Sequence, residues 1–195
     1  MTDRFDQIIE PEPGIEYGVL KGWTYASCIV FIKLPQSENI YGYRSKFHRF
    51  AKELNRRTGY HVVCAENHGD DISKKYDIEI LNEVVSNVVK NTPVEYRFIG
   101  IDEGATYGLS HMCRQICFTK MLLINMPISY ELDQTVALLN GVDRRTLRFV
   151  YGEEDRSYRY TPLLKRLYAD VITVKNADHN FTGMSSSFVD LQKMI

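Results

Sequence analysis

Residues 97–106 read RFIGIDEGAT, and the organisation of the whole chain follows from this stretch. An apolar, β-prone run leads through Gly100 to Asp102 and Gly104, and helix-forming residues follow at once. Glycine at both flanking positions allows the chain to fold tightly back over its own strand, because a Cβ atom there would clash with the neighbouring backbone. The pattern predicts a nucleophile elbow, a sharp strand-to-helix turn that presents one side chain above a sheet. That residue is usually serine, and here it is Asp102.

Composition describes an ordinary globular protein. The 195 residues are 44% hydrophobic and 25% charged, which suits one domain with a sizeable core. We therefore expect a single domain over residues 1–195, in which residues 1–22 form a lead-in with an edge hairpin and no cap is inserted. The N-terminus lacks the apolar core of a signal peptide, and no apolar run approaches the ~20 residues of a membrane span. These features predict a cytoplasmic protein.

Charge and aromatic residues indicate the kind of partner. The net charge of −1 provides no electrostatic basis for binding nucleic acid or a membrane surface. The 13 tyrosines and 9 phenylalanines are spread along the chain and do not cluster with Lys and Arg, so no stacking platform for single strands is expected. We expect a small-molecule substrate or ligand as partner, with neither nucleic acid nor membrane; the sequence does not indicate an oligomeric state.

Cysteine and histidine spacing does not predict a metal site. The four cysteines form no CxxC pair and no Cys/His cluster with zinc spacing. His111 with Cys113 and Cys117 is better explained by helix packing, and His68 with Asp70 by the polarity of a loop. We therefore expect reduced cysteines, no metal and no organic cofactor.

Short apolar runs alternate with segments of helical periodicity. Strands are predicted at residues 28–32, 61–65, 96–101, 121–126, 147–151 and 171–174. Helices are predicted at residues 45–58, 73–90, 103–117, 132–139 and 163–167, and near the C-terminus. This alternation is typical of βα units on a parallel sheet. The fold class is therefore α/β, with a three-layer αβα arrangement around a doubly wound, mostly parallel sheet.

The strand exits carry three groups in a suggestive order. Sites in open α/β sheets form beyond the carboxyl ends of the strands. Asp102 follows one strand, the acidic run at residues 153–155 follows a later strand, and His179 follows the last one. The order is nucleophile, acid and base. In the acidic run, the Gly-x-x-Asp spacing favours Asp155 over Glu153 and Glu154.

With these motifs the chain resembles the α/β-hydrolase fold family, and in particular its small members without a cap. The matching pieces are GIDEGA at residues 100–105, YGEED at 151–155 and NADHNF at 176–181, and the resemblance covers nearly all of the chain from Cys28 onward. It implies that Asp102 is the nucleophile and His179 the base. It also implies that Asp155 orients His179.

The resemblance further implies an oxyanion hole. Its donors would be the backbone N–H of Glu103 and one N–H in the loop from Leu34 to Gln36. Pro35, between those two residues, has no N–H to donate. The side chain of Glu103 would add negative charge beside any oxyanion, which argues against ordinary acyl transfer.

Aspartate at the elbow resembles haloalkane dehalogenases and epoxide hydrolases, whose carboxylate forms an alkyl ester that activated water then hydrolyses. Those enzymes carry a cap, whereas residues 127–145 are too short for one. We interpret the chain as a hydrolase of a small ester or other electrophilic carbon compound that uses an Asp-His-Asp triad. The alternative is a catalytically degenerate member of the fold, a binding or interaction module in which Asp102 only bonds the helix N-terminus. An acyltransferase or thioesterase is a third reading.

Overall fold

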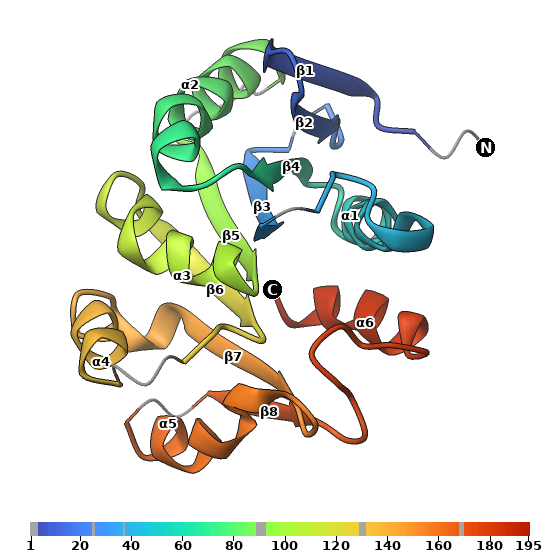
Figure 1. Ribbon diagram of the computed structural model, residues 1–195. Helices are drawn as coiled ribbons and strands as arrows, with labels where there is room; N and C mark the ends of the chain where they lie inside the picture. Colours follow the sequence, from blue (N-terminus) through green and yellow to red (C-terminus); the bar gives the residue numbers. More distant parts are fainter. Residues whose placement is uncertain (1–3, 25, 37, 89–92, 129–131, 168–169) are drawn as a thin grey trace.

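The computed structural model describes residues 4–24, 26–36, 38–88, 93–128, 132–167 and 170–195 (Figure 1). The predicted helix at residues 73–90 extends two residues beyond the described part. Residues 129–131, in the segment 127–145 that is too short for a cap, also lie outside it.

The described strands form one eight-stranded sheet in the order β1-β2-β4-β3-β5-β6-β7-β8. β1 pairs antiparallel with β2, and β2 with β4, whereas all other pairs are parallel. The prediction of a mostly parallel α/β sheet is therefore confirmed. The strands are β1 (Gln7–Glu12), β2 (Ile15–Leu20), β3 (Cys28–Gln36), β4 (His61–Asn67), β5 (Glu95–Ile101), β6 (Phe118–Ile124), β7 (Leu147–Gly152) and β8 (Val171–Val174).

Helices cover both faces of this sheet, which gives three layers (Figure 1). One face carries α2 (Asp70–Val88), α3 (Glu103–Ser110), α4 (Leu132–Asn140) and α5 (Thr161–Leu167), and the other carries α1 (Lys46–Thr58) and α6 (Ser185–Asp190). Each face has its own apolar core, because the strands are buried on both sides. Short 3₁₀ helices complete the described elements: η1 (Tyr43–Ser45), η2 (Met112–Arg114), η3 (Arg144–Thr146), η4 (Arg156–Tyr160) and η5 (Leu191–Met194).

Several element boundaries differ from the sequence-based expectation. β3 continues to Gln36 instead of ending at residue 32, because Lys33 is not at the surface but fully buried in an ion pair with Asp77. α3 ends at Ser110 instead of residue 117, since His111 leaves the helical region with φ −125° and the separate turn η2 follows. As a result Cys113 is half-buried and Cys117 is exposed, so the expectation that helix packing buries this pair is wrong.

Candidate active site

Asp102 lies at a sharp turn between β5 and α3. Its φ of 54° and ψ of −123° are rare for a residue with a side chain, and such conformations concentrate at functional sites. Glycine makes the turn feasible: a Cβ at Gly100 would lie 2.3 Å from the Cα of Ala105, and one at Gly104 would lie 2.3 Å from the carbonyl oxygen of Lys33. The start of α3 therefore packs directly on the backbone of β3, which aims Asp102 beyond the carboxyl edge of the sheet.

His179 joins two carboxylates in one chain of hydrogen bonds. Its Nε2 lies 2.9 Å from Oδ2 of Asp102, and its Nδ1 hydrogen-bonds Oδ2 of Asp155. The second oxygen of Asp155 accepts the backbone N–H of Ser157 at 2.6 Å, so both oxygens of this buried carboxylate are fixed. The neighbouring Glu153 instead accepts the backbone N–H of Asn176. Of the acidic run, the structure thus brings Asp155 to the histidine.

The two carboxylates stabilise the charged form of His179. The hydrogen bond to Asp102, followed by the one to Asp155, raises the pKa of His179 to about 10, although partial burial acts in the opposite direction. His179 is therefore an imidazolium at neutral pH and donates to both carboxylates. The side chain of Asp155 is 2% exposed, that of Asp102 16% and that of His179 42%, so solvent reaches His179 and Asp102 while Asp155 is buried.

Asp102 does not cap the helix that follows it. No side-chain capping hydrogen bond joins Asp102 to the N-terminus of α3, and its carboxylate points to His179 instead. The alternative in which Asp102 only bonds the helix N-terminus is therefore wrong. The Asp102 carboxylate at the tip of the elbow therefore contacts two side chains, His179 and the neighbouring Glu103 carboxyl.

The predicted oxyanion donors are already engaged. The backbone N–H of Gln36 donates to Oε2 of Glu103 at 3.2 Å. The Glu103 carboxyl also accepts from its own backbone N–H; these two bonds lower its pKa, but burial and the nearby charge of Asp102 raise the pKa more. Leu34 is buried, and its carbonyl oxygen faces Gly104. The Glu103 carboxyl thus accepts hydrogen bonds from two of the predicted donors, the N–H groups of Gln36 and Glu103.

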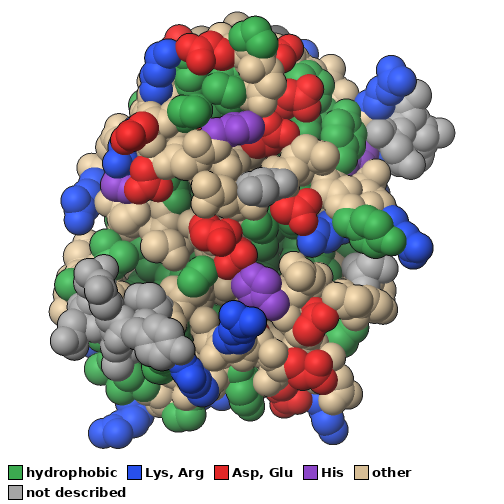
Figure 2. Space-filling model, viewed as in Figure 1, with side chains coloured by type: hydrophobic (Ala, Val, Ile, Leu, Met, Phe, Trp, Pro, Cys, Tyr) green, Lys and Arg blue, Asp and Glu red, His purple; other side chains and the backbone are tan. Residues whose placement is uncertain are grey.

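A cavity of about 600 Å³ opens beside the triad. Its walls come from the elbow, the end of β6, the acidic run after β7 and the loop after β8, and they include Asp102, Glu103, Ile128, Arg156, Asp178 and His179. On the face viewed in Figure 2, acidic side chains and a histidine are exposed together near the centre, with basic side chains close by. The cavity is large enough for a small molecule to reach the Asp102 carboxylate.

Asn125 is a site residue that sequence reasoning missed. It is buried just after β6 with φ of 48°, a conformation that asparagine tolerates better than most residues. Its Nδ2 donates to the carbonyl oxygen of His179 at 2.7 Å, and its Oδ1 accepts the N–H of Gly152 at 3.0 Å. Asn125 therefore ties the end of β7 to the histidine loop. The signal in the sequence was a single amide inside the otherwise apolar run at residues 121–126.

The other histidines of interest form simple pairs. His68 Nε2 lies 2.8 Å from a Glu66 oxygen, and His111 Nε2 lies 2.7 Å from an Asp70 oxygen. Within the described ranges, no group of three or more His, Cys, Asp or Glu side chains is arranged to hold a metal ion. None of the helices in those ranges combines the length and apolar composition that a membrane span requires.

Comparison with known proteins identifies the fold. No protein-family model and no curated protein matches the chain. Solved structures do match, among them an α/β serine hydrolase homologue from Coxiella burnetii, at 13% identity and a TM-score of 0.68 over 96% of both chains.

Two further structures give the same result. A serine hydrolase without a lid from Xanthomonas campestris is 13% identical, with a TM-score of 0.66 over 96% of this chain and 91% of that one. The esterase domain of a Rhodothermus marinus protein is 13% identical, with a TM-score of 0.66 over 96% and 94%. The chain therefore has the α/β-hydrolase fold, as the three sequence motifs predicted.

Proposed function

We propose that this protein is a hydrolase of small electrophilic carbon compounds, with Asp102 as nucleophile, His179 as base and Asp155 as the group that orients His179. One observation carries the proposal: the Asp102 carboxylate sits at the tip of a strained strand-to-helix turn and lies 2.9 Å from His179. The esterases and serine hydrolases of similar fold support hydrolysis as the reaction class. Fold alone does not define function, so the site carries the argument.

The first step is attack by Asp102. One carboxylate oxygen bonds to the electrophilic carbon, and the bond from that carbon to the leaving group breaks, with its electron pair going to the leaving group. The product is an alkyl ester on Asp102. His179, as an imidazolium, cannot act as a base in this step, but it holds the carboxylate in place through Nε2.

Ester formation itself prepares His179 for the second step. Esterification removes the anionic acceptor on Asp102, and the hydrogen bond to this acceptor is the largest cause of the raised His179 pKa. That pKa then falls, and the imidazolium loses the Nε2 proton more readily. Neutral His179 accepts a proton from water, and the resulting hydroxide attacks the ester carbonyl carbon of Asp102. The bond from the carbonyl carbon to the alkyl oxygen breaks, and that oxygen takes the proton back from His179 and leaves as the alcohol. The Asp102 carboxylic acid then gives its own proton to His179, which restores the carboxylate and the imidazolium.

Glu103 explains why alkyl substrates are favoured over acyl substrates. Attack on a carboxylic ester would place a new oxyanion at the N–H groups of Gln36 and Glu103, which the Glu103 carboxylate occupies. Attack of Asp102 on an alkyl carbon creates no such oxyanion. Hydrolysis of the aspartyl ester does create one, so Glu103 must become protonated or move aside during that step.

A trapping experiment tests the nucleophilic role. His179→Gln keeps a polar side chain but removes the base, so after incubation with small epoxides and haloalkanes we expect a stable ester on the peptide that contains Asp102. His111→Gln is a matched control, because His111 also pairs with an aspartate but lies outside the cavity. Mass spectrometry of the digested protein reads the adduct. Turnover of His179→Gln at the parental rate would show that the mechanism is wrong.

A second candidate function has one observation in its favour. The Glu103 carboxyl accepts hydrogen bonds from N–H groups that were predicted to stabilise an oxyanion. The fold therefore also suits a catalytically degenerate protein that binds a ligand in the cavity without reaction. In that case Asp102 would acquire no adduct with any electrophile in any variant. Glu103→Ala, which removes the carboxyl from these N–H groups, distinguishes the two functions. In an enzyme the aspartyl ester should hydrolyse faster in this variant, whereas in a binding module no ester forms.

A further inference from the structure

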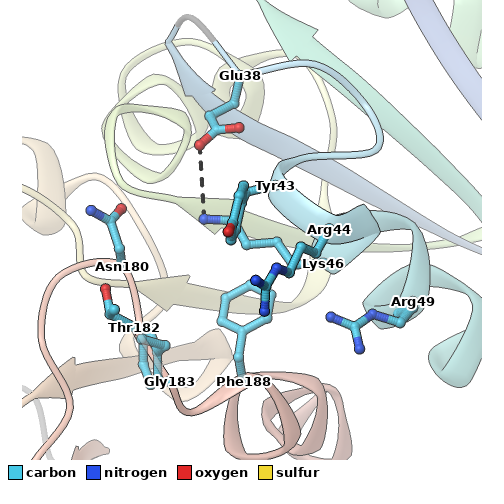
Figure 3. A pocket seen from close by; sticks show the side chains of 10 residues that line it. Glu38, Tyr43, Arg44, Lys46, Arg49, Asn180, Thr182, Gly183 and Phe188 are labelled. Atoms are coloured by element: carbon cyan, nitrogen blue, oxygen red, sulfur yellow. Dashed lines mark ion pairs between the residues drawn. The ribbon is translucent and has the colours of Figure 1, made fainter.

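A second cavity, of about 540 Å³, lies next to the candidate active site and is basic (Figure 3). η1 and the first turns of α1 form one wall, and the loop after β8 forms the opposite wall with Asn180 and Thr182. Three cationic side chains line it, against one carboxylate, that of Glu38. The cations are Arg44, Lys46 and Arg49.

The charges of this cavity are poorly balanced within the protein. Lys46 Nζ lies 3.8 Å from Glu38 Oε1, so the one acid offsets the lysine only loosely. Arg44 rests against the ring of Tyr43, 5.2 Å from its centroid, and Arg49 forms no ion pair within the described residues. Two guanidinium groups therefore remain without a carboxylate partner in the cavity. Guanidinium is the side-chain group best suited to planar carboxylate and to phosphate.

The backbone turn before α1 presents these side chains to the cavity. Arg44 and Ser45 have φ values of 50° and 57°, two successive left-handed residues without glycine. Each costs of order 1 kcal/mol and persists only where the surroundings impose it. Tyr43, in the same turn, is 70% exposed, although large apolar rings are normally covered. The cavity thus offers an uncovered ring beside the cations.

A small hollow lies between the basic cavity and the triad. Its lining includes Asp102 and His179 at one end, and it shares Lys46, Asn180 and Phe188 with the basic cavity at the other. This hollow has room for only about one water molecule. The two large cavities themselves adjoin at Asn180, which lines both, so a molecule held at the arginines can reach past Asn180 toward the nucleophile. In the cavity at that end, five carboxyls outnumber three basic side chains. The carboxyls are those of Asp102, Glu103, Glu154, Asp155 and Asp178, and the basic side chains are Arg156, Arg159 and His179.

The contrast in charge identifies the ligand class. The acidic triad end repels an anion, whereas the basic cavity attracts one, so a molecule with an anionic end enters in a single orientation. We propose that the basic cavity binds the carboxylate or phosphate group of a small molecule whose electrophilic carbon reacts at Asp102. The reaction of the electrophilic carbon rests on the proposed nucleophilic role of Asp102. The binding of the anion in the basic cavity does not depend on that role.

Calorimetric binding of two unreactive probes, benzoate and phenyl phosphate, tests the anion site. We expect the parent protein to bind at least one, and Arg44→Gln/Arg49→Gln to lose about tenfold or more in affinity. Arg56→Gln/Arg145→Gln is the matched control, since both of these arginines are exposed and pair with acids outside the cavity. Its affinity should equal that of the parent. Added salt should weaken binding to the parent. The stronger probe shows whether carboxylate or phosphate is preferred.

Electrophiles with and without charge test the connection to Asp102. In His179→Gln, 3-chloropropionate should form the Asp102 ester faster than 3-chloropropan-1-ol does, and the two arginine substitutions should remove this preference without slowing the neutral compound. Asp102→Asn should still bind the probes. If neither probe binds the parent with Kd below about 10 mM, or if the arginine and control pairs behave alike, the anion site is wrong. If probes bind as expected but no electrophile modifies Asp102, only the nucleophilic role fails.

Discussion

Two clusters of charged side chains adjoin the elbow, and they are balanced in opposite ways. Between β3 and α2, Lys33 and Asp77 form an ion pair at 2.9 Å, and both side chains are 0% exposed. The Tyr17 hydroxyl donates to Asp77 at 2.7 Å, and Lys33 donates to the Glu66 carbonyl at 2.7 Å. In the other cluster, one partly exposed histidine faces two carboxylates.

This difference shows which charged groups support the fold and which are accessible for a reaction. Burial lowers the pKa of Lys33 and raises that of Asp77, and the attraction between them opposes both shifts. This closed, neutral pair fixes the end of β3, whose Lys33 carbonyl lies against Gly104 of the elbow. The His179 cluster carries surplus negative charge at the edge of a cavity, where it is available to a substrate.

The largest effect is expected from breaking the closed pair. Asp77→Asn leaves the Lys33 charge buried without a counter-charge, so unfolding free energy should fall by about 3–5 kcal/mol in urea denaturation. Asp71→Asn, an exposed acid in the first turn of the same helix, is the control and should cost less than about 1 kcal/mol. Similar stability of the two variants would show that the pair does not hold β3 in place.

An intermediate effect is expected at Asn125, which joins the structural frame to the reactive cluster. Asn125→Ala removes the partners of the buried Gly152 N–H and His179 carbonyl, at a cost of about 1–3 kcal/mol in unfolding free energy. Asn125→Asp keeps the acceptor for Gly152 but loses the donor to His179. Proton NMR of the His179 ring should therefore show a less fixed imidazole in both variants. An unchanged ring signal in Asn125→Ala would mean that the loop is positioned by other contacts.

The smallest effect concerns pH. The folded pKa of His179, about 10, lies above its usual value of 6.5, so folding favours the protonated ring. Its contribution to stability is fully present below pH 6.5 and is lost as pH rises toward 10. Because His179 is 42% exposed, solvent screens the interaction, and we expect a loss of only about 1 kcal/mol or less.

Urea denaturation at several pH values measures this contribution, with His179→Gln as the reference that lacks it. NMR titration of the ring gives the pKa directly, and Asp102→Asn should lower it. A ring that titrates near 6.5 in the parent protein would mean that the two carboxylates do not hold the imidazolium.

The sequence predicted those features that depend on local pattern. The alternation of apolar runs and helical periodicity indicated the sheet, and the spacing around Asp102, Asp155 and His179 placed all three at strand exits that the structure brings together. Features that depend on distant partners were not predictable. Lys33 resembled the first residue of a loop, and nothing nearby indicated its burial, because its partner Asp77 is 44 residues away. Likewise, nothing near Glu103 in the sequence indicates its bond to Gln36.

The most direct test of the account follows the oxygen of water into Asp102. The parent protein is allowed to turn over the small epoxides and haloalkanes in heavy-oxygen water, and the peptide that contains Asp102 is then weighed by mass spectrometry. Because water attacks the ester carbonyl of Asp102, we expect heavy oxygen in that carboxylate after turnover, and none in the Asp102→Asn variant. Turnover with an unlabelled Asp102 would contradict the covalent mechanism and would reduce Asp102 to a supporting role.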